Sequence, residues 1–427
     1  HCAINAFGKT YMKKLLPFVL VLLSFLFPTM GVSDLSSNVF STQKKLNELG
    51  FNAGVVDGIW GGTTKNALIE FLSGKGIKFD GLLDENEFKI LGISNARCKA
   101  NPHKRTKHKL AITWKQEINC PAEVFVAKDV KQSTKNNIEA TLKAASDAWG
   151  NFGPVEYWVM GIDQAYSIEL IKKYCQRRAE NGNMNFDYCL KREKNSGHGM
   201  LSYQKSGAEA LASKRPFGSA GHNGGMDWGI HKFGSSLPFG FEGKLDMPAG
   251  EDQKTVMHEY FHAVQHAHIL ELQRYKRDKL WGPVWFVEGG AEYMASVTYK
   301  RLISEKKLDL IKNSKWEYDF RQSMQEKFQR AKNQNTRHNC ILQMREITYN
   351  SPCREFFYDG GAWAVAYLLN QTNENILLNE FYPNLEKLGW EGAFKKSFSK
   401  SSKEFYKEFA GFLKQDITSA MQIIPQY

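Results

Sequence analysis

His258-Glu259-Tyr260-Phe261-His262 is the stretch of the chain whose residue types and spacing are best suited to chemistry. Residues four apart lie on one face of an α-helix, so His258 and His262 can direct two imidazoles at one metal ion. Glu259 would then lie beside that ion, where it could accept a proton from a bound water. A catalytic zinc site also needs a third protein ligand and one open position for water.

Two residues are candidates for the third ligand. His268 occupies the place of the third histidine in a longer HExxHxxGxxH pattern, but Gln265 stands where that pattern has a glycine. Glutamine favours helix, so the helix is expected to continue and carry His268 away from the metal. Glu288 opens a second apolar, helix-like stretch after a short connection that contains Gly282 and Pro283. The spacing favours Glu288 and leaves open His268, or an ordinary helix without a metal.

The second stretch reads WFVEGGAEY over residues 285–293. Together with HEYFH, it resembles the gluzincin superfamily of zinc metallopeptidases, and EGxAEY is similar to the wording in bacterial collagenase-type members. The resemblance implies that Glu288 is the third Zn²⁺ ligand and that Glu292, one turn later, orients His258 and fixes its tautomer. It is specific over residues 252–300 and only general beyond them.

Composition sets broad limits on the protein. A chain of 427 residues with 42% hydrophobic residues can bury a large core, and its length predicts two domains. The net charge of +12 is compatible with contact to an anionic cell-surface polymer or simply with solubility. No basic run alternates with aromatic residues, so nucleic-acid binding is not expected.

The N-terminal residues 1–33 resemble an export signal. A basic Met12-Lys13-Lys14 precedes an almost entirely apolar stretch from Leu15 to Phe27, so we expect translation to start at Met12 and residues 1–11 to be upstream read-through. The alternative is an uncleaved membrane anchor. The prediction is a secreted, periplasmic or wall-associated protein that meets the membrane only through this segment.

Cysteine usage agrees with export. Six cysteines beyond Cys2 fall into pairs that are close in sequence, and no CxxC spacing suggests a cysteine-bound metal. The predicted disulfides are Cys98–Cys120, Cys175–Cys189 and Cys340–Cys353.

Residues 34–93 are expected to form a three-helix module. Q-x-x-L-x-x-L-G-F at 43–51, D-G-I-W-G at 57–61 and T-x-x-A-L at 64–68 together resemble the peptidoglycan-binding-domain family. The second helix is expected to start at a cap, Thr63 or Thr64. The resemblance implies peptidoglycan as a partner, although such modules also serve as structural prodomains.

A basic linker at 94–109 is predicted to lead into a metallopeptidase domain at 110–427. The fold class expected is α+β, in which a gluzincin (thermolysin-like) domain combines a small mixed sheet, an active-site helix and a helical C-terminal subdomain. The expected strands are 111–114, 122–126, 155–160 and an edge strand within 217–243, and the expected helices include 137–149 and 168–178.

The active-site helix is expected to begin at an Asp252 cap and to run to about Tyr275, with His266 and His268 partly exposed. Gly289-Gly290 inside the next helix is unfavourable by roughly 1 kcal/mol per glycine relative to alanine. That cost is understandable if two helices approach closely around a metal, and a kinked helix is the alternative.

Gluzincins often supply a tyrosine from the helical half of the domain to stabilise the oxyanion. In this chain the resemblance points to Tyr358, and the alternative is a tyrosine of the interfacial core.

The sequence thus predicts a secreted zinc metallopeptidase that acts on protein or peptide, with Glu259 as general base. A peptidase of peptidoglycan cross-links is the second hypothesis, and a catalytically inactive wall-binding protein is the third. Peptide specificity, oligomeric state and activation have no signature in the sequence.

Overall fold

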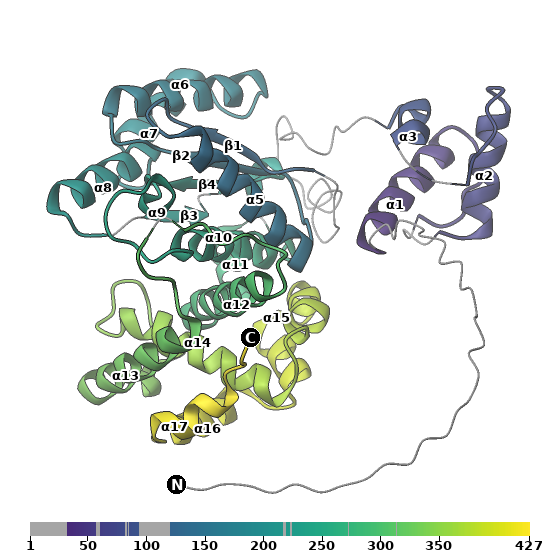
Figure 1. The fold of residues 1–427 in the computed structure, drawn as a ribbon. Helices are drawn as coiled ribbons and strands as arrows, with labels where there is room; N and C mark the ends of the chain where they lie inside the picture. The colour runs from purple at the N-terminus through teal and green to yellow at the C-terminus, as the bar shows by residue number, and fades with distance from the viewer. Residues whose placement is uncertain are drawn as a thin grey trace, which may run out of the picture.

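The computed structural model describes residues 32–427 except 57–59, 82, 84, 94–119, 217–218, 223, 272 and 313 (Figure 1). Several predictions therefore lie outside the described residues. These are the signal segment up to residue 31, the linker, the strand at 111–114 and Cys98.

The N-terminal unit contains the three expected helices, α1 (Val32–Glu48), α2 (Gly62–Ser73) and α3 (Glu85–Leu91). It has a small core of its own, to which Leu46, Leu68 and Leu72 contribute. The predicted cap of α2 is wrong, because the N-cap is Gly61. Thr64 is buried instead, and its hydroxyl donates to the carbonyl of Ala53 (3.1 Å), which ties α2 to the preceding loop.

A four-stranded mixed sheet forms the first layer of the larger unit. Its order is β1 (Glu123–Val126), β2 (Val155–Val159), β4 (His231–Ser235), β3 (Ala220–His222). β1, β2 and β4 are parallel, whereas β3 runs antiparallel at the edge. The strands at 122–126 and 155–160 and the edge strand within 217–243 are confirmed. The same glycine-rich segment also contributes β4, an internal strand that the sequence did not indicate.

Helices cover both faces of this sheet. Alternation along β2 places Tyr157 on one face and Trp158 on the other. Trp158 packs edge-to-face on Tyr174 of α6 (Gln164–Glu180), with ring centroids 5.1 Å apart. On the opposite face, α5 (Gln132–Trp149) meets α10 (Glu251–Ala267), where Trp149 contacts Phe261 at 5.0 Å. α10, which carries the HExxH motif, is thus held by the sheet and by α5.

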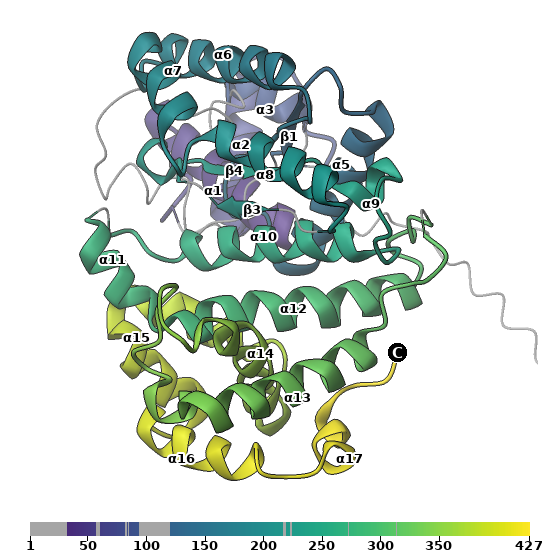
Figure 2. The same ribbon diagram turned by 90° about the vertical axis from the view of Figure 1, so that its left-hand side faces the viewer.

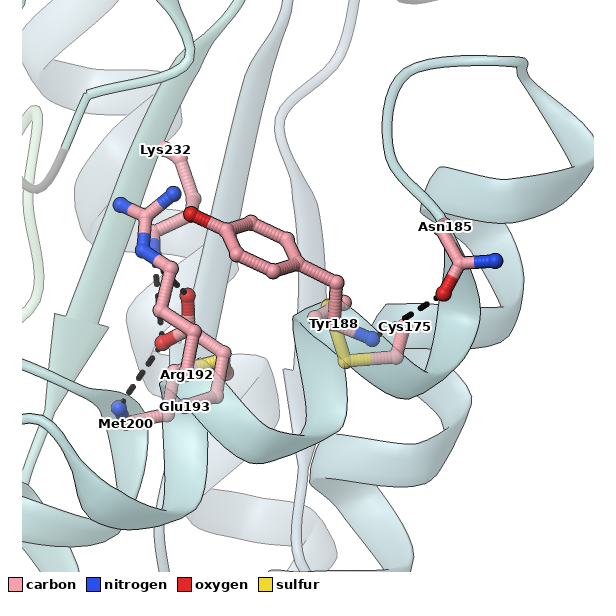
Figure 3. The surroundings of a disulfide bond; sticks show 8 residues. Cys175, Asn185, Tyr188, Arg192, Glu193, Met200 and Lys232 are labelled. Carbon is pink, nitrogen blue, oxygen red and sulfur yellow. Dashed lines mark hydrogen bonds and ion pairs between the residues drawn. A yellow bond between two sulfur atoms is a disulfide. The ribbon is translucent and has the colours of Figure 1, made fainter.

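Two more helices, α7 (Phe186–Asn195) and α8 (Met200–Ser213), follow α6 before the chain returns to the sheet. The Cys175–Cys189 disulfide joins α6 to α7 (Figure 3). Beside it, the buried Glu193 accepts the backbone N–H of Met200 at 3.0 Å. The predicted pairs Cys175–Cys189 and Cys340–Cys353 are confirmed.

The remainder of the larger unit is helical, as expected. α10 lies between the sheet and α12, and the later helices pack on the other side of α12 (Figures 1 and 2). No described helix combines the length and apolar character needed to cross a bilayer. The remaining helices are α9 (Phe239–Glu242), α11 (Arg274–Trp281), α12 (Val284–Ser304), α13 (Phe320–His338), α14 (Arg354–Gln371), α15 (Tyr382–Phe398), α16 (Ser402–Phe412) and α17 (Ile417–Ala420).

Both ends of α10 differ from the prediction. Its N-cap is Gly250, while the carboxylate of Asp252 accepts the N–H of Phe241 at 2.8 Å. Burial raises the pKa of Asp252 to about 7. The helix ends at Ala267 rather than near Tyr275, because the His268 side chain contacts the Val264 carbonyl at 2.8 Å and the chain then leaves the helix. His266 and His268 are buried, not partly exposed as expected.

The two glycines of α12 serve different purposes. A Cβ on Gly289 would come within 2.2 Å of the carbonyl carbon of Gly361 in α14, so the close approach is to α14 and not to α10. A Cβ on Gly290 would meet only ordinary contacts, the nearest at 3.5 Å. Gly289 and Gly361 therefore allow α12 and α14 to cross at backbone contact.

Gly289→Ala should destabilise the fold, whereas Gly290→Ala should not. The added methyl at 289 must separate two backbones, and overpacking of this kind typically costs about 1–3 kcal/mol. At 290 the exchange should be neutral or should stabilise by up to about 1 kcal/mol, because alanine is the better helix former. Urea unfolding of both variants measures the difference. Equal stability of the two variants would contradict this account of the crossing.

Candidate metal centre

Two neighbouring helices present the predicted site residues. His258, Glu259 and His262 lie on α10, and Glu288 and Glu292 lie one turn apart on α12. All five side chains are buried. A helix places residues four apart on the same face, so α10 directs its two histidines at α12 and α12 directs its two glutamates back.

The ligand atoms converge on one point. Nε2 of His258 lies 3.4 Å, and Nε2 of His262 lies 3.6 Å, from Oε2 of Glu288. Among the described residues these three form the one group whose metal-ligating atoms all lie within 4.8 Å of one another. In a tetrahedral zinc site with bonds of about 2.0–2.1 Å, neighbouring ligand atoms are about 3.3 Å apart. The donor set and its spacing therefore fit Zn²⁺.

The far side of each imidazole is held by an acceptor. Nδ1 of His258 lies 3.1 Å from Oε2 of Glu292, as the resemblance implied. Nδ1 of His262 lies 2.8 Å from Oε1 of Gln265, whose amide nitrogen donates to the Val287 carbonyl at 3.0 Å. Because oxygen acceptors hold a proton on each Nδ1, the Nε2 atom of each ring is the one that faces Glu288 and that can bind a metal once it is unprotonated.

Sequence reasoning missed the role of Gln265. It was considered only as the residue that replaces a glycine, although it lies three positions after His262 and so shares its helix face. The spacing of three positions between His262 and Gln265 was the signal in the sequence that could have indicated this contact. Its amide also lies 3.3 Å from the Tyr382 hydroxyl, so Gln265 links a histidine of the site to α12 and α15.

Glu292 is kept charged by a group of cations. Lys254 and Lys327 place their ammonium nitrogens 3.1 and 3.0 Å from its Oε1. Burial disfavours the carboxylate, but these lysines and His258 outweigh burial and hold the pKa of Glu292 well below its usual range. Lys327 also contacts Asp359 of α14 at 3.5 Å. The acceptor behind His258 is thus fixed from α10, α13 and α14.

The carboxylates of Glu288, Glu292 and Glu259 favour a positive charge among the ligand atoms. Burial lowers the pKa of His258, but its hydrogen bonds to Glu288 and Glu292 outweigh burial and raise it to about 10. Burial likewise opposes the charge of Glu288, yet His262 and His258 hold its pKa below the usual range. In the metal-free chain a proton on His258 supplies this positive charge, and a divalent cation would replace it.

Glu259 lies next to the group formed by His258, His262 and Glu288, and one of its carboxylate oxygens makes no hydrogen bond to a described residue. Its Oε2 is buried and has no hydrogen-bond partner among the described residues. Burial raises the pKa of Glu259, and the two histidines of the motif oppose the rise. A carboxylate with a raised pKa and an uncommitted oxygen is suited to accept a proton from a water molecule.

Two tyrosines lie near the centre. Tyr358, predicted from the resemblance, is half-buried on α14 and lines a cavity of about 450 Å³ with Lys254, Glu292 and Asp359. Burial first, then the charges of Glu288 and Glu259, raise the pKa of Tyr358, so its hydroxyl lies within electrostatic range of both carboxylates. Tyr349, which the sequence did not indicate, donates its hydroxyl proton to Oε1 of Glu288.

None of the described histidines His222, His231, His266 and His268 joins the ligand group. His268 packs on Phe152 with ring centroids 4.8 Å apart, so the structure places this alternative ligand in the core. His222 of β3 and His231 of β4 contact each other, with Nε2 and Nδ1 3.0 Å apart. His222 also stacks on His266 at 4.4 Å. His222, His231 and His266 thus form a cluster that connects β3 and β4 to α10.

Comparison with known proteins places one part of the chain in a family. Residues 36–91 match the family described as "Putative peptidoglycan binding domain". No curated protein and no solved structure matches the chain. The chain thus carries an N-terminal domain of the peptidoglycan-binding type, as the motifs at 43–68 predicted. This match says nothing about the α10–α12 centre.

Proposed function

We propose that this protein is a secreted zinc metallopeptidase of the gluzincin type, with a thermolysin-like catalytic domain. The observation that carries the proposal is the convergence of His258, His262 and Glu288, with Glu292 and Gln265 behind the two imidazoles. A bound zinc ion would act there as a Lewis acid and lower the pKa of a water molecule to about 7.

The side chains of this centre have distinct tasks in peptide hydrolysis. Glu259 accepts the proton of the attacking water through its uncommitted oxygen and then donates it to the leaving amine. Glu292 and Gln265 keep the Nε2 atoms of the two histidines directed at one point. Tyr358, near Glu259 and Glu288, is the candidate donor to the oxyanion.

The sheet edge beside α10 supports a peptide substrate. β3 pairs with β4 on one side, and no other described strand pairs with it. An extended peptide can add to such an edge through backbone hydrogen bonds. His222 of β3 also takes part in lowering the pKa of Glu259 through its backbone, so this edge lies close to the proposed base. Protein or peptide is therefore the substrate class that we favour.

The peptidoglycan-binding domain supports a site of action at the cell wall. It would concentrate the enzyme on the wall, where both wall-associated proteins and the peptide cross-links of peptidoglycan are present. Hydrolysis of these cross-links is the second candidate activity, because the same domain would deliver that substrate to the centre.

Removal of the metal tests the proposal. The purified full chain should hydrolyse denatured protein, lose this activity in a chelator and regain it when zinc is restored. Magnesium should not restore it, because the donor set of two imidazoles and one carboxylate favours zinc. The same assay on purified sacculi, with analysis of released peptides, measures the second activity. No bound zinc and no turnover of either substrate would instead indicate a non-catalytic wall-binding protein.

A further inference from the structure

The segment between α13 and α14 carries Tyr349 to the metal centre. It runs from Cys340 to Cys353 and is closed by the disulfide between them, whose Cα atoms lie 5.5 Å apart. Both cysteines are fully buried, and Cys353 is the N-cap of α14. Each end of the segment is therefore fixed to a helix that packs on the site.

The interior of the segment is also anchored. Met344 and Ile347 are buried in the main core. Tyr349 itself is 46% exposed, and its ring packs edge-to-face on the buried Phe357, with centroids 5.1 Å apart. The ring thus lies at the surface, while the hydroxyl reaches inward to Glu288.

The two oxygens of Glu288 are used differently. Oε1 accepts the hydrogen bond from Tyr349, whereas Oε2 faces the Nε2 atoms of His258 and His262 at 3.4 and 3.6 Å. A glutamate side chain can rotate about several bonds, so a second contact is needed to fix the plane of its carboxylate. The Tyr349 hydroxyl supplies that contact.

We propose that Tyr349, presented by the segment closed by Cys340–Cys353, is a positioning residue that makes Glu288 a metal ligand through Oε2 alone. With Oε1 held by the phenol, Glu288 fills one coordination position and leaves another for water, as a catalytic zinc site requires. This inference rests on the proposed function, and it adds a residue and a disulfide to the machinery of the site.

The test is the zinc affinity of Tyr349→Phe, measured by competition with a chromophoric chelator. Outer partners of metal ligands typically contribute 10–100-fold in affinity, so Tyr349→Phe should weaken zinc binding by about 10-fold or more. Tyr188→Phe is the matched control, because Tyr188 is also an exposed tyrosine within a disulfide-closed segment, Cys175–Cys189 (Figure 3). It should bind zinc like the wild type.

The disulfides provide a second matched pair. Cys340→Ala with Cys353→Ala should weaken zinc binding, whereas Cys175→Ala with Cys189→Ala should not, although the bridged residues are separated by a similar 13 and 14 positions. In a Tyr349→Phe background, loss of Cys340–Cys353 should add little, because both changes remove the same contact.

The outcomes separate this inference from the proposed function. Wild-type affinity in Tyr349→Phe, in a chain that binds zinc, would overturn the role of Tyr349 and leave the metallopeptidase proposal intact. Equal weakening by loss of either disulfide would show that general destabilisation, and not the segment, controls affinity. A wild-type chain that binds no zinc would overturn the proposed function and this inference with it.

Discussion

Glu259→Gln should retain zinc and lose nearly all peptide hydrolysis. Glutamine preserves the size of the side chain but cannot accept a proton at neutral pH, and general-base catalysis contributes about 10²–10⁴-fold to rate. None of the three ligand atoms belongs to Glu259, so metal binding should be unaffected. The measurement is kcat/KM on a peptide substrate together with the zinc content of the same preparation.

A matched control separates the loss of a base from the loss of a charge. Glu169→Gln removes a carboxylate on the surface of α6, where Glu169 pairs with Lys128 at 2.7 Å, and it should leave both zinc content and rate unchanged. Wild-type turnover by Glu259→Gln would mean that another group accepts the proton. Loss of zinc in Glu259→Gln would mean that Glu259 supports the ligands, a role that the structure does not indicate.

The part of the site that follows from local periodicity could be predicted from the sequence. His258 and His262 share a face because they are four apart, and Glu288 and Glu292 share a face for the same reason. The apolar residues of α10 agree with this placement, because Met257, Phe261 and Val264 are all fully buried.

Contacts between distant segments could not be predicted in this way. Tyr349 reaches Glu288 across 61 positions of sequence, and no repeat or motif connects the two. The Cys340–Cys353 pair did mark a closed segment, but spacing alone does not say where such a segment points. The end of α10 was also missed, because helix propensity favours continuation past Gln265, whereas the helix ends at Ala267, where the His268 side chain contacts the Val264 carbonyl and packs on Phe152.

The central strand β4 was also difficult to recognise. β4 is short, contains Gly234 and begins with two polar residues, His231 and Lys232. All five of its residues are nevertheless buried. Lys232 is tolerated there because its ammonium group lies 5.0 Å from the centre of the Tyr174 ring and 4.0 Å from Glu193. A polar strand stabilised by buried partners lacks the apolar run that predicts a central strand.

Glu288→Ala should abolish zinc binding at ordinary metal concentrations. The substitution removes one of three ligands and leaves two imidazoles, so the loss of affinity should exceed the roughly 10–100-fold that removal of an outer partner causes. Glu292→Gln provides that comparison, because Glu292 contacts His258 but contributes no ligand atom. Metal analysis after dialysis, followed by chelator competition, gives both values.

His268→Ala decides between the two ligands that the sequence left open. The imidazole of His268 contacts the Val264 carbonyl and packs against Phe152, so its removal should reduce stability while zinc affinity stays at the wild-type level. The opposite result, zinc kept by Glu288→Ala and lost by His268→Ala, would require α10 to extend and turn differently in the metal-bound protein. The backbones of α12 and α14 are in contact at Gly289 and Gly361, next to Glu288 on α12. Because this contact fixes the position of α12, we expect the Glu288 carboxylate to be in place before the metal binds.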